Sequence, residues 1–159
     1  MPVYAWRIAA DTPDYGSDDL SGEGARLAGG RWNRAGTPLA YWASSRSLAC
    51  LEALVNLGQS PIPLNRYLVE IEIPDDVWTH RETFDRQVGI GWDALPAGLV
   101  SLDWGTSWAN ESRCAVAVVP SVVVPEEWCL LVNPRHPENA RLTARKLRRW
   151  TFDFRFGPR

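Results

Sequence analysis

"GGRWNRAGTPLAYWA", residues 29–43, joins a glycine- and arginine-rich turn directly to a short aromatic segment. Glycines let a backbone approach a ligand closely, and an arginine fork can bind two phosphate oxygens at once. Residues 39–43 follow a Gly-Thr-Pro turn signal and are predicted to form a strand, with Tyr41 on the opposite face from its neighbours. The stretch is therefore either a ligand cradle built on Arg31 and Tyr41 or only a loop that enters a core.

The rest of the chain predicts a mixed fold in which strands outnumber helices. The expected strands are 3–8, 39–43, 67–73, 115–119, 122–124, 128–132 and 150–156, and the expected helices are 46–57 and 105–113. Residues 11–30 read as a long loop and residues 74–104 as irregular. Because strands and helices do not alternate, we expect an α+β fold, mostly antiparallel, in one domain covering residues 1–159.

Composition and charge exclude several classes of protein. The chain has 159 residues, nine tryptophans and a net charge of −2, and its pI is about 5.7. A protein that grips nucleic acid non-specifically usually carries a basic excess, so we expect no direct nucleic-acid binding. The start of the chain does not resemble a signal peptide and no stretch is long and apolar enough to span a membrane, so we expect a cytoplasmic protein.

The residues that bind metals or act as nucleophiles are sparse. Cys50, Cys114 and Cys129 show no CxxC spacing and are predicted to be buried, reduced thiols. With two histidines and no HExxH motif, we expect no metal site. The chain also lacks a phosphate-binding GxxxxGK[ST] loop and a GxSxG elbow. Gly22-Glu23-Gly24 begins a GxGxxG motif, but Leu27 occupies the position of the third glycine.

Glu52 is the strongest candidate for a functional residue. The predicted helix 46–57 is apolar on nearly all sides and should be buried. Glu52 shares a face with Leu48 and Val55. A buried carboxylate costs several kcal/mol unless it is paired, so Glu52 is either functional or the partner of an arginine in a structural ion pair.

Two further polar residues interrupt apolar strands. Ser121 follows Pro120 between two valine-rich runs, where a bend or bulge is the ordinary explanation. Asn133 begins an Asn-Pro-Arg-His-Pro segment that reads as a strand-ending turn. The basic residues of 141–149 are typical of a solvated face or of a partner contact.

Taken in order, these residues form a set of short motifs. They are Gly-Gly-Arg31-Trp-Asn, Tyr41-Trp-Ala-Ser, Leu51-Glu52, Val119-Pro120-Ser121 and Val132-Asn133-Pro134-x-His136-Pro137. The ordered set resembles the RES domain, a family named for its Arg, Glu and Ser. The resemblance runs from residues 4–8 through 152–155, and only the segment 74–104 matches nothing in the family's pattern.

The resemblance implies a fold similar to that of ADP-ribosyltransferases and a toxin of a bacterial type II toxin–antitoxin pair. Such toxins degrade NAD⁺ as phosphorylases or glycohydrolases, with inorganic phosphate or water as acceptor and no cofactor. By the same resemblance Arg31, Tyr41, Glu52 and Ser121 form the active site, and Asn133 is a further substrate-binding residue. The implied partner is an Xre-type helix-turn-helix antitoxin, which residues 141–149 could contact. Homo-oligomerisation is left open.

A mechanism follows from charge if this resemblance holds. Breaking the nicotinamide–ribose bond develops positive charge on the ribose, which the Glu52 carboxylate would stabilise. Arg31 would hold the pyrophosphate or an attacking phosphate, and Tyr41 would stack on nicotinamide or hydrogen-bond. Ser121 would position a ribose or phosphate oxygen.

Two other functions remain open from the sequence. A protein mono-ADP-ribosyltransferase would use the same fold and NAD⁺ but a macromolecular acceptor. A single-stranded nucleic-acid binding module would use Trp32, Arg34 and Trp42 for stacking and backbone contacts, although the acidic pI weighs against it.

Overall fold

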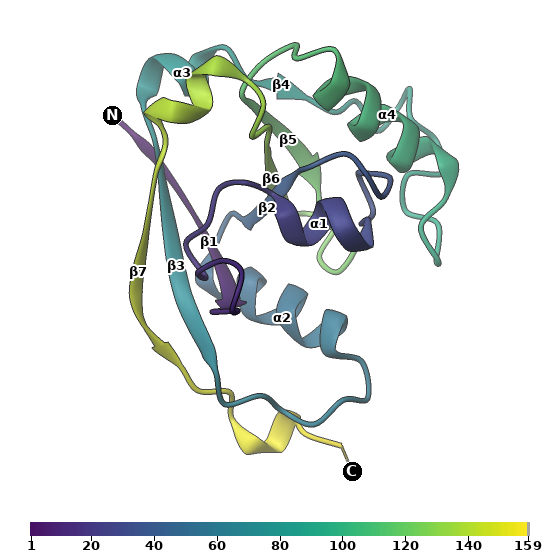
Figure 1. Cartoon of the computed structure of the whole chain (residues 1–159). Helices are drawn as coiled ribbons and strands as arrows, with labels where there is room; N and C mark the ends of the chain where they lie inside the picture. Colours follow the sequence, from purple (N-terminus) through teal and green to yellow (C-terminus); the bar gives the residue numbers. More distant parts are fainter. Residues whose placement is uncertain (159) are drawn as a thin grey trace.

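A seven-stranded sheet organises residues 1–158, which are the residues that this computed structural model describes (Figure 1). The strands are β1 Val3–Ala10, β2 Ala40–Ala43, β3 Arg66–Ile73, β4 Glu82–Thr83, β5 Val116–Pro120, β6 Trp128–Val132 and β7 Thr143–Trp150. They lie in the order β4-β5-β6-β2-β1-β3-β7, and all neighbours are antiparallel except β4 and β5. The predicted α+β fold with a mostly antiparallel sheet is confirmed.

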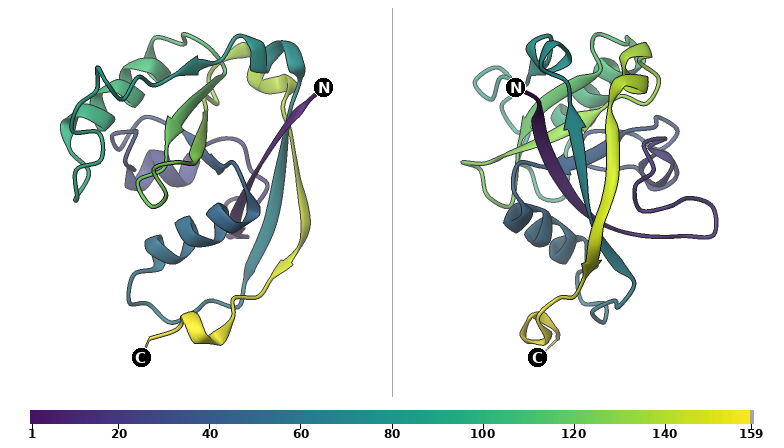
Figure 2. Two further views of the ribbon diagram at one scale, coloured as in Figure 1. Left: turned by 180° about the vertical axis from the view of Figure 1, so that it is seen from behind. Right: turned by 90° about the vertical axis from the view of Figure 1, so that its left-hand side faces the viewer.

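The sheet changes direction sharply between β1 and β2. In the right-hand view of Figure 2 the long strands β1, β3 and β7 run from top to bottom, whereas β2, β5 and β6 lie across them. β1 pairs with β3 along its whole length, but it meets β2 in register only at Trp6 and Ala43. The two halves of the sheet therefore diverge beyond this junction, and α2 packs against both β1 and β2 there.

The helices are short and flank the sheet. They are α1 Glu23–Ala28, α2 Arg46–Leu57, α3 Asp75–Thr79 and α4 Leu99–Asn110, with 3-10 turns η1 Pro137–Arg141 and η2 Phe154–Phe156. Ser45 caps α2 because its hydroxyl accepts a hydrogen bond of 3.0 Å from the Leu48 amide. Gly58 ends the helix with a φ of 57°. The predicted boundaries of this helix are confirmed.

The prediction that α2 is buried on all sides is wrong. Leu48 and Ala49 are buried, but Leu51 and Val55 are 38% and 58% exposed. The sheet covers only one face of the helix, so apolar residues on the other faces meet solvent or a cavity. Composition could not reveal this, because an apolar residue is compatible with either environment.

Two segments predicted to be irregular contain ordered elements. Residues 11–30 include α1, and residues 74–104 include α3, β4 and the first half of α4. The fourth helix begins at Leu99 rather than at residue 105. Gly105, which reads as a helix boundary in the sequence, lies in the helix interior and is buried there.

The predicted strands 122–124 and 150–156 are also wrong. Residues 122–124 belong to the turn between β5 and β6, where the amides of Val123 and Val124 donate to the Ser121 hydroxyl instead of to a strand. The aromatic alternation of residues 150–156 is interrupted by η2, in which Asp153 accepts from the Arg155 amide at 2.9 Å.

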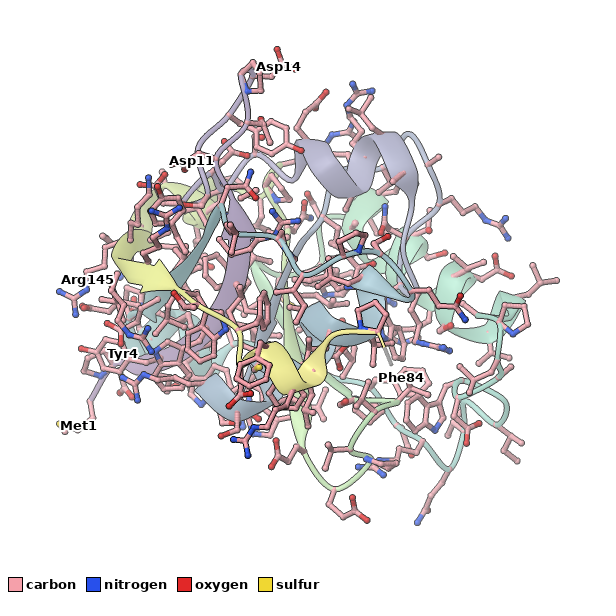
Figure 3. All side chains as sticks on the ribbon, turned by 90° about the horizontal axis from the view of Figure 1, so that it is seen from below. Met1, Tyr4, Asp11, Asp14, Phe84 and Arg145 are labelled. Carbon is pink, nitrogen blue, oxygen red and sulfur yellow. The ribbon has the colours of Figure 1, made fainter. Side chains whose placement is uncertain are left out.

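The basic run 141–149 forms most of β7, at the edge of the sheet. Figure 3 shows Arg145 extending outward from this strand. Arg145 pairs with Glu70 at 2.7 Å, and Lys146 pairs with Asp11 at 2.8 Å. The segment is solvated as predicted, but it is also a strand. Charged side chains on an edge strand discourage pairing with another chain.

The strand β2 presents its two faces to different parts of the core. Ala40 and Trp42 pack in a cluster with residues of β1, β3 and β6, whereas Tyr41 packs on the other side against the cluster that contains Trp32. The predicted opposite orientation of Tyr41 is confirmed. Trp32 and Trp42 are only 3% and 2% exposed, so neither ring is free to stack on a nucleic-acid base.

Candidate active site

A cavity of about 520 Å³ opens between α1, the loop 29–32, the C-terminal half of α2 and the β5–β6 turn. Four of the predicted site residues line it, namely Arg31, Tyr41, Glu52 and Ser121. They come from a loop, a strand, a helix and a turn that are far apart in the sequence. The structure therefore brings a guanidinium, a phenol, a carboxylate and a hydroxyl to one cavity.

The Glu52 carboxylate is held by neutral donors. The Ser121 hydroxyl donates to Glu52 Oε1 at 2.8 Å, and the Cys129 thiol donates to the same oxygen at 3.6 Å. Within residues 1–158, no arginine or lysine forms a salt bridge with Glu52. The arginine partner that a structural ion pair would require is thus missing from the described part of the chain, which disfavours that alternative.

Ser121 has used its hydrogen-bonding capacity. Its hydroxyl donates its proton to Glu52 and accepts from the amides of Val123 and Val124, both at 3.1 Å. Its own amide donates to the Glu127 carbonyl at 3.0 Å, and the residue is 1% exposed. A hydroxyl has one donor and two acceptor sites. These hydrogen bonds indicate that Ser121 orients the carboxylate of Glu52.

The Tyr41 hydroxyl is turned away from open solvent and bound on two sides. It donates to Asn33 Oδ1 at 2.6 Å and accepts from the Trp32 amide at 3.1 Å. Burial raises the pKa of the phenol well above its usual range. Gly30 permits this arrangement, because a Cβ at that position would lie 2.7 Å from the Tyr41 oxygen. A ligand in the cavity would therefore contact mainly the aromatic ring of Tyr41.

Asn33 holds the loop 29–37 together, a role that the sequence did not predict. The side chain is fully buried, and its Nδ2 donates to the carbonyls of Ala25, Thr37 and Arg34 at 2.8, 2.9 and 3.2 Å. It thus ties α1 to the loop and orients Tyr41. The available signal was an asparagine inside a glycine-rich turn, a residue type that satisfies turn backbones.

Arg31 is held by the segment 74–104, which matched no motif of the family. Its Nη1 donates to the Trp92 carbonyl at 3.0 Å and to the Ala94 carbonyl at 2.9 Å. Neither Nε nor Nη2 has a protein acceptor within the described residues. Both are directed donors that remain for an anion.

An aromatic cluster supports the backbone of this loop. The Trp32 ring lies 4.8 Å from Phe84, 5.8 Å from Trp104 and 6.4 Å from Trp92, measured between ring centroids. Helix α4 approaches so closely that a Cβ on Gly105 would lie 1.9 Å from the Trp32 carbonyl oxygen. These contacts fix Arg31, which directly precedes Trp32.

Asn133 is not brought to the cavity. It is fully buried, its Nδ2 donates to the Ala109 carbonyl at 3.0 Å and its Oδ1 accepts from the Arg135 amide at 3.1 Å. It follows the end of β6 and ties this end to α4. These bonds give Asn133 a structural role, and it is not among the residues that line the cavity.

A smaller cavity of about 200 Å³ adjoins the first. Tyr41, Glu52, Asn56 and Cys129 line both cavities. The smaller one extends toward Trp6 at the junction of β1 and β2. Asn56 and Cys129 are lining residues that the sequence alone did not single out.

The cysteines are free thiols, as predicted, although each is only partly buried. Among residues 1–158, no three His, Cys, Asp or Glu side chains gather closely enough to hold a metal ion. In the same range, no helix is both long enough and apolar enough to cross a membrane.

Comparison with known proteins agrees with the ordered motifs. The family model of the RES domain matches residues 4–155. This chain belongs to the RES domain family. The match covers the loop 29–37, α2 and the β5–β6 turn, so the cavity of this RES domain lies entirely within the matched region.

Several curated relatives of this RES domain are toxins. A protein of Sphingobium sp. named Prs ADP-ribosylating toxin is 53% identical over 154 residues, which cover 96% of each chain. A protein of Yersinia enterocolitica named Toxin Res is 38% identical over 77% of this chain and 79% of its own. A Toxin Res of Pseudomonas putida is 36% identical over 84% of this chain and 86% of its own.

Proposed function

We propose that this RES domain is a toxin that cleaves the nicotinamide–ribose bond of NAD⁺. The observation that carries the proposal is the convergence of Arg31, Tyr41, Glu52 and Ser121 on one cavity. The names of the relatives support a toxin, and one of those names includes ADP-ribosylation. NAD⁺ would be a substrate and not a resident cofactor.

We assign the electrostatic stabilisation of the transition state to Glu52. As the bond to nicotinamide breaks, the ribose gains oxocarbenium character and the pyridinium nitrogen loses its positive charge. A fixed carboxylate next to the ribose stabilises that transition state more than the ground state. Because Oε1 is bound by Ser121 and Cys129, Oε2 is the oxygen left to face the ribose.

Of the other residues, Arg31 and Tyr41 would bind the substrate and Ser121 would orient Glu52. Arg31 would bind the pyrophosphate through Nε and Nη2, since Nη1 is already used. The Tyr41 ring would pack against the nicotinamide ring, because the hydroxyl is committed to Asn33. Ser121 would orient Glu52 and not bind a substrate oxygen, as its hydroxyl has no free site.

The acceptor of the ADP-ribosyl group decides between two forms of this function. The name of the Sphingobium relative supports transfer to a protein, and we place this form first. Transfer to inorganic phosphate or water, which would deplete NAD⁺, is the second form. A cognate antitoxin of the Xre type and a cytoplasmic location belong to the same proposal.

One experiment distinguishes these forms. The purified protein is incubated with NAD⁺ labelled in the adenosine part, in buffer alone, with phosphate, and with a cell lysate. Label on a protein band supports protein ADP-ribosylation, and free ADP-ribose or its 1″-phosphate supports the depleting form. Absence of nicotinamide release under all three conditions would refute the proposed function.

A further inference from the structure

Cys129 lies in β6, where it is in register with Ala43 of β2 and Val119 of β5. Its thiol faces Glu52 and lines both cavities. We infer that Cys129 is a positioning residue that, together with Ser121, fixes Glu52 Oε1 and so presents Oε2 to the ligand. This inference rests on the proposed role of Glu52.

The geometry of the carboxylate carries the inference. Ser121 and Cys129 belong to one hairpin, β5–β6, and both of their side chains donate to the same oxygen. No donor contacts Glu52 Oε2 within residues 1–158. Two donors on one oxygen restrict rotation about the bond to the carboxyl carbon, which a single donor would leave freer. The hairpin therefore determines which oxygen is available.

The thiol is protonated and can donate at neutral pH. Burial raises the pKa of Cys129 far above its usual range, and the negative charge of Glu52 acts in the same direction. A thiolate at this distance would repel the carboxylate. Since S–H is a weak donor, Cys129 adds to the stronger bond from Ser121 and does not replace it.

The first test separates orientation from binding. Cys129→Ala, Cys129→Ser and the control Cys50→Ala are compared for kcat and KM with NAD⁺. Loss of one hydrogen bond predicts a fall in kcat of about fivefold for Cys129→Ala, with KM unchanged. Serine restores a donor and should recover part of the loss. The Cys50→Ala variant, which alters a residue on the same helix as Glu52, should leave kcat and KM unchanged. Full kcat in Cys129→Ala would overturn the inference.

The second test does not depend on turnover. Alkylation of the folded protein by iodoacetamide at pH 9 is followed at each cysteine by mass spectrometry, in the wild type and in Glu52→Gln. Removing the carboxylate charge lowers the pKa of the Cys129 thiol, so its alkylation should become severalfold faster. Cys50 and Cys114 serve as internal controls and should not change.

The outcomes of the two tests can be told apart. An unchanged Cys129 alkylation rate in Glu52→Gln would show that the two groups are not paired and would overturn the inference. A wild-type protein that releases no nicotinamide would instead refute the proposed function. The alkylation rates would still decide the pairing of Cys129 with Glu52.

Discussion

The Ser121 hydroxyl donates a 2.8 Å hydrogen bond to Glu52 Oε1 across 69 residues of sequence. The same hydroxyl accepts from two amides of the β5–β6 turn, so a rigid hairpin determines where the carboxylate of α2 points. The Glu52 carboxylate is thereby fixed beside a cavity, and within residues 1–158 no arginine or lysine forms a salt bridge with it. A carboxylate in this state can respond to positive charge that develops on a ligand.

Replacing Glu52 by glutamine should remove activity and keep the fold. The amide oxygen of glutamine can still accept from Ser121, whereas the negative charge is lost. We expect nicotinamide release to fall by about 100- to 1,000-fold, the range found when a transition-state contact is removed. The measurement is chromatography of nicotinamide, with thermal unfolding as the control for folding. Wild-type turnover in Glu52→Gln would exclude Glu52 from the mechanism.

Arg31 and Arg34 form a matched pair of variants in one loop. Arg31 lines the cavity, whereas Arg34 forms an ion pair with Asp103. Loss of two charge-assisted hydrogen bonds to the pyrophosphate predicts a fall in kcat/KM of about 100-fold or more for Arg31→Ala. Arg34→Ala should keep kcat/KM near the wild-type value. Equal losses in the two variants would mean that general loop charge, and not Arg31, binds the substrate.

Tyr41→Phe should affect stability more than chemistry. The phenylalanine keeps the ring but leaves Asn33 Oδ1 and the Trp32 amide without their partner. We expect the free energy of unfolding to fall by about 1–3 kcal/mol, measured by urea denaturation. Turnover per folded molecule should stay close to wild type, whereas Tyr41→Ala should lose it together with the ring. Inactive but fully folded Tyr41→Phe would assign a chemical role to the hydroxyl.

Gly105→Ala should destabilise the protein through the loop that carries Arg31. The added methyl group would lie 1.9 Å from the Trp32 carbonyl oxygen, so α4 and the loop must separate. We expect a loss of about 1–3 kcal/mol, as in other overpacked cores, and a raised KM for NAD⁺. Ser107→Ala, an exposed position on the same helix, is the control. A Gly105→Ala protein as stable as the wild type would contradict the close approach.

Local signals were sufficient where one segment determines its own structure. The alternation around Tyr41 predicted the two faces of β2, and the serine and glycine at its ends predicted the extent of α2. The same signals failed for residues 122–124, where the Ser121 side chain competes for backbone amides. They failed again for the outer faces of α2, because composition does not reveal which face a sheet will cover.

The sequence by itself determined the motifs, their order and thus the family of this RES domain, including the four residues that line one cavity. Only the tertiary structure decided that Ser121 and Cys129 hold Glu52, and that no arginine of residues 1–158 does. It also anchored Arg31 to carbonyls 61 and 63 residues away and left Asn133 outside the cavity. The physical reason is that these hydrogen bonds join distant segments. Their geometry depends on the order and twist of the strands, which no local periodicity contains.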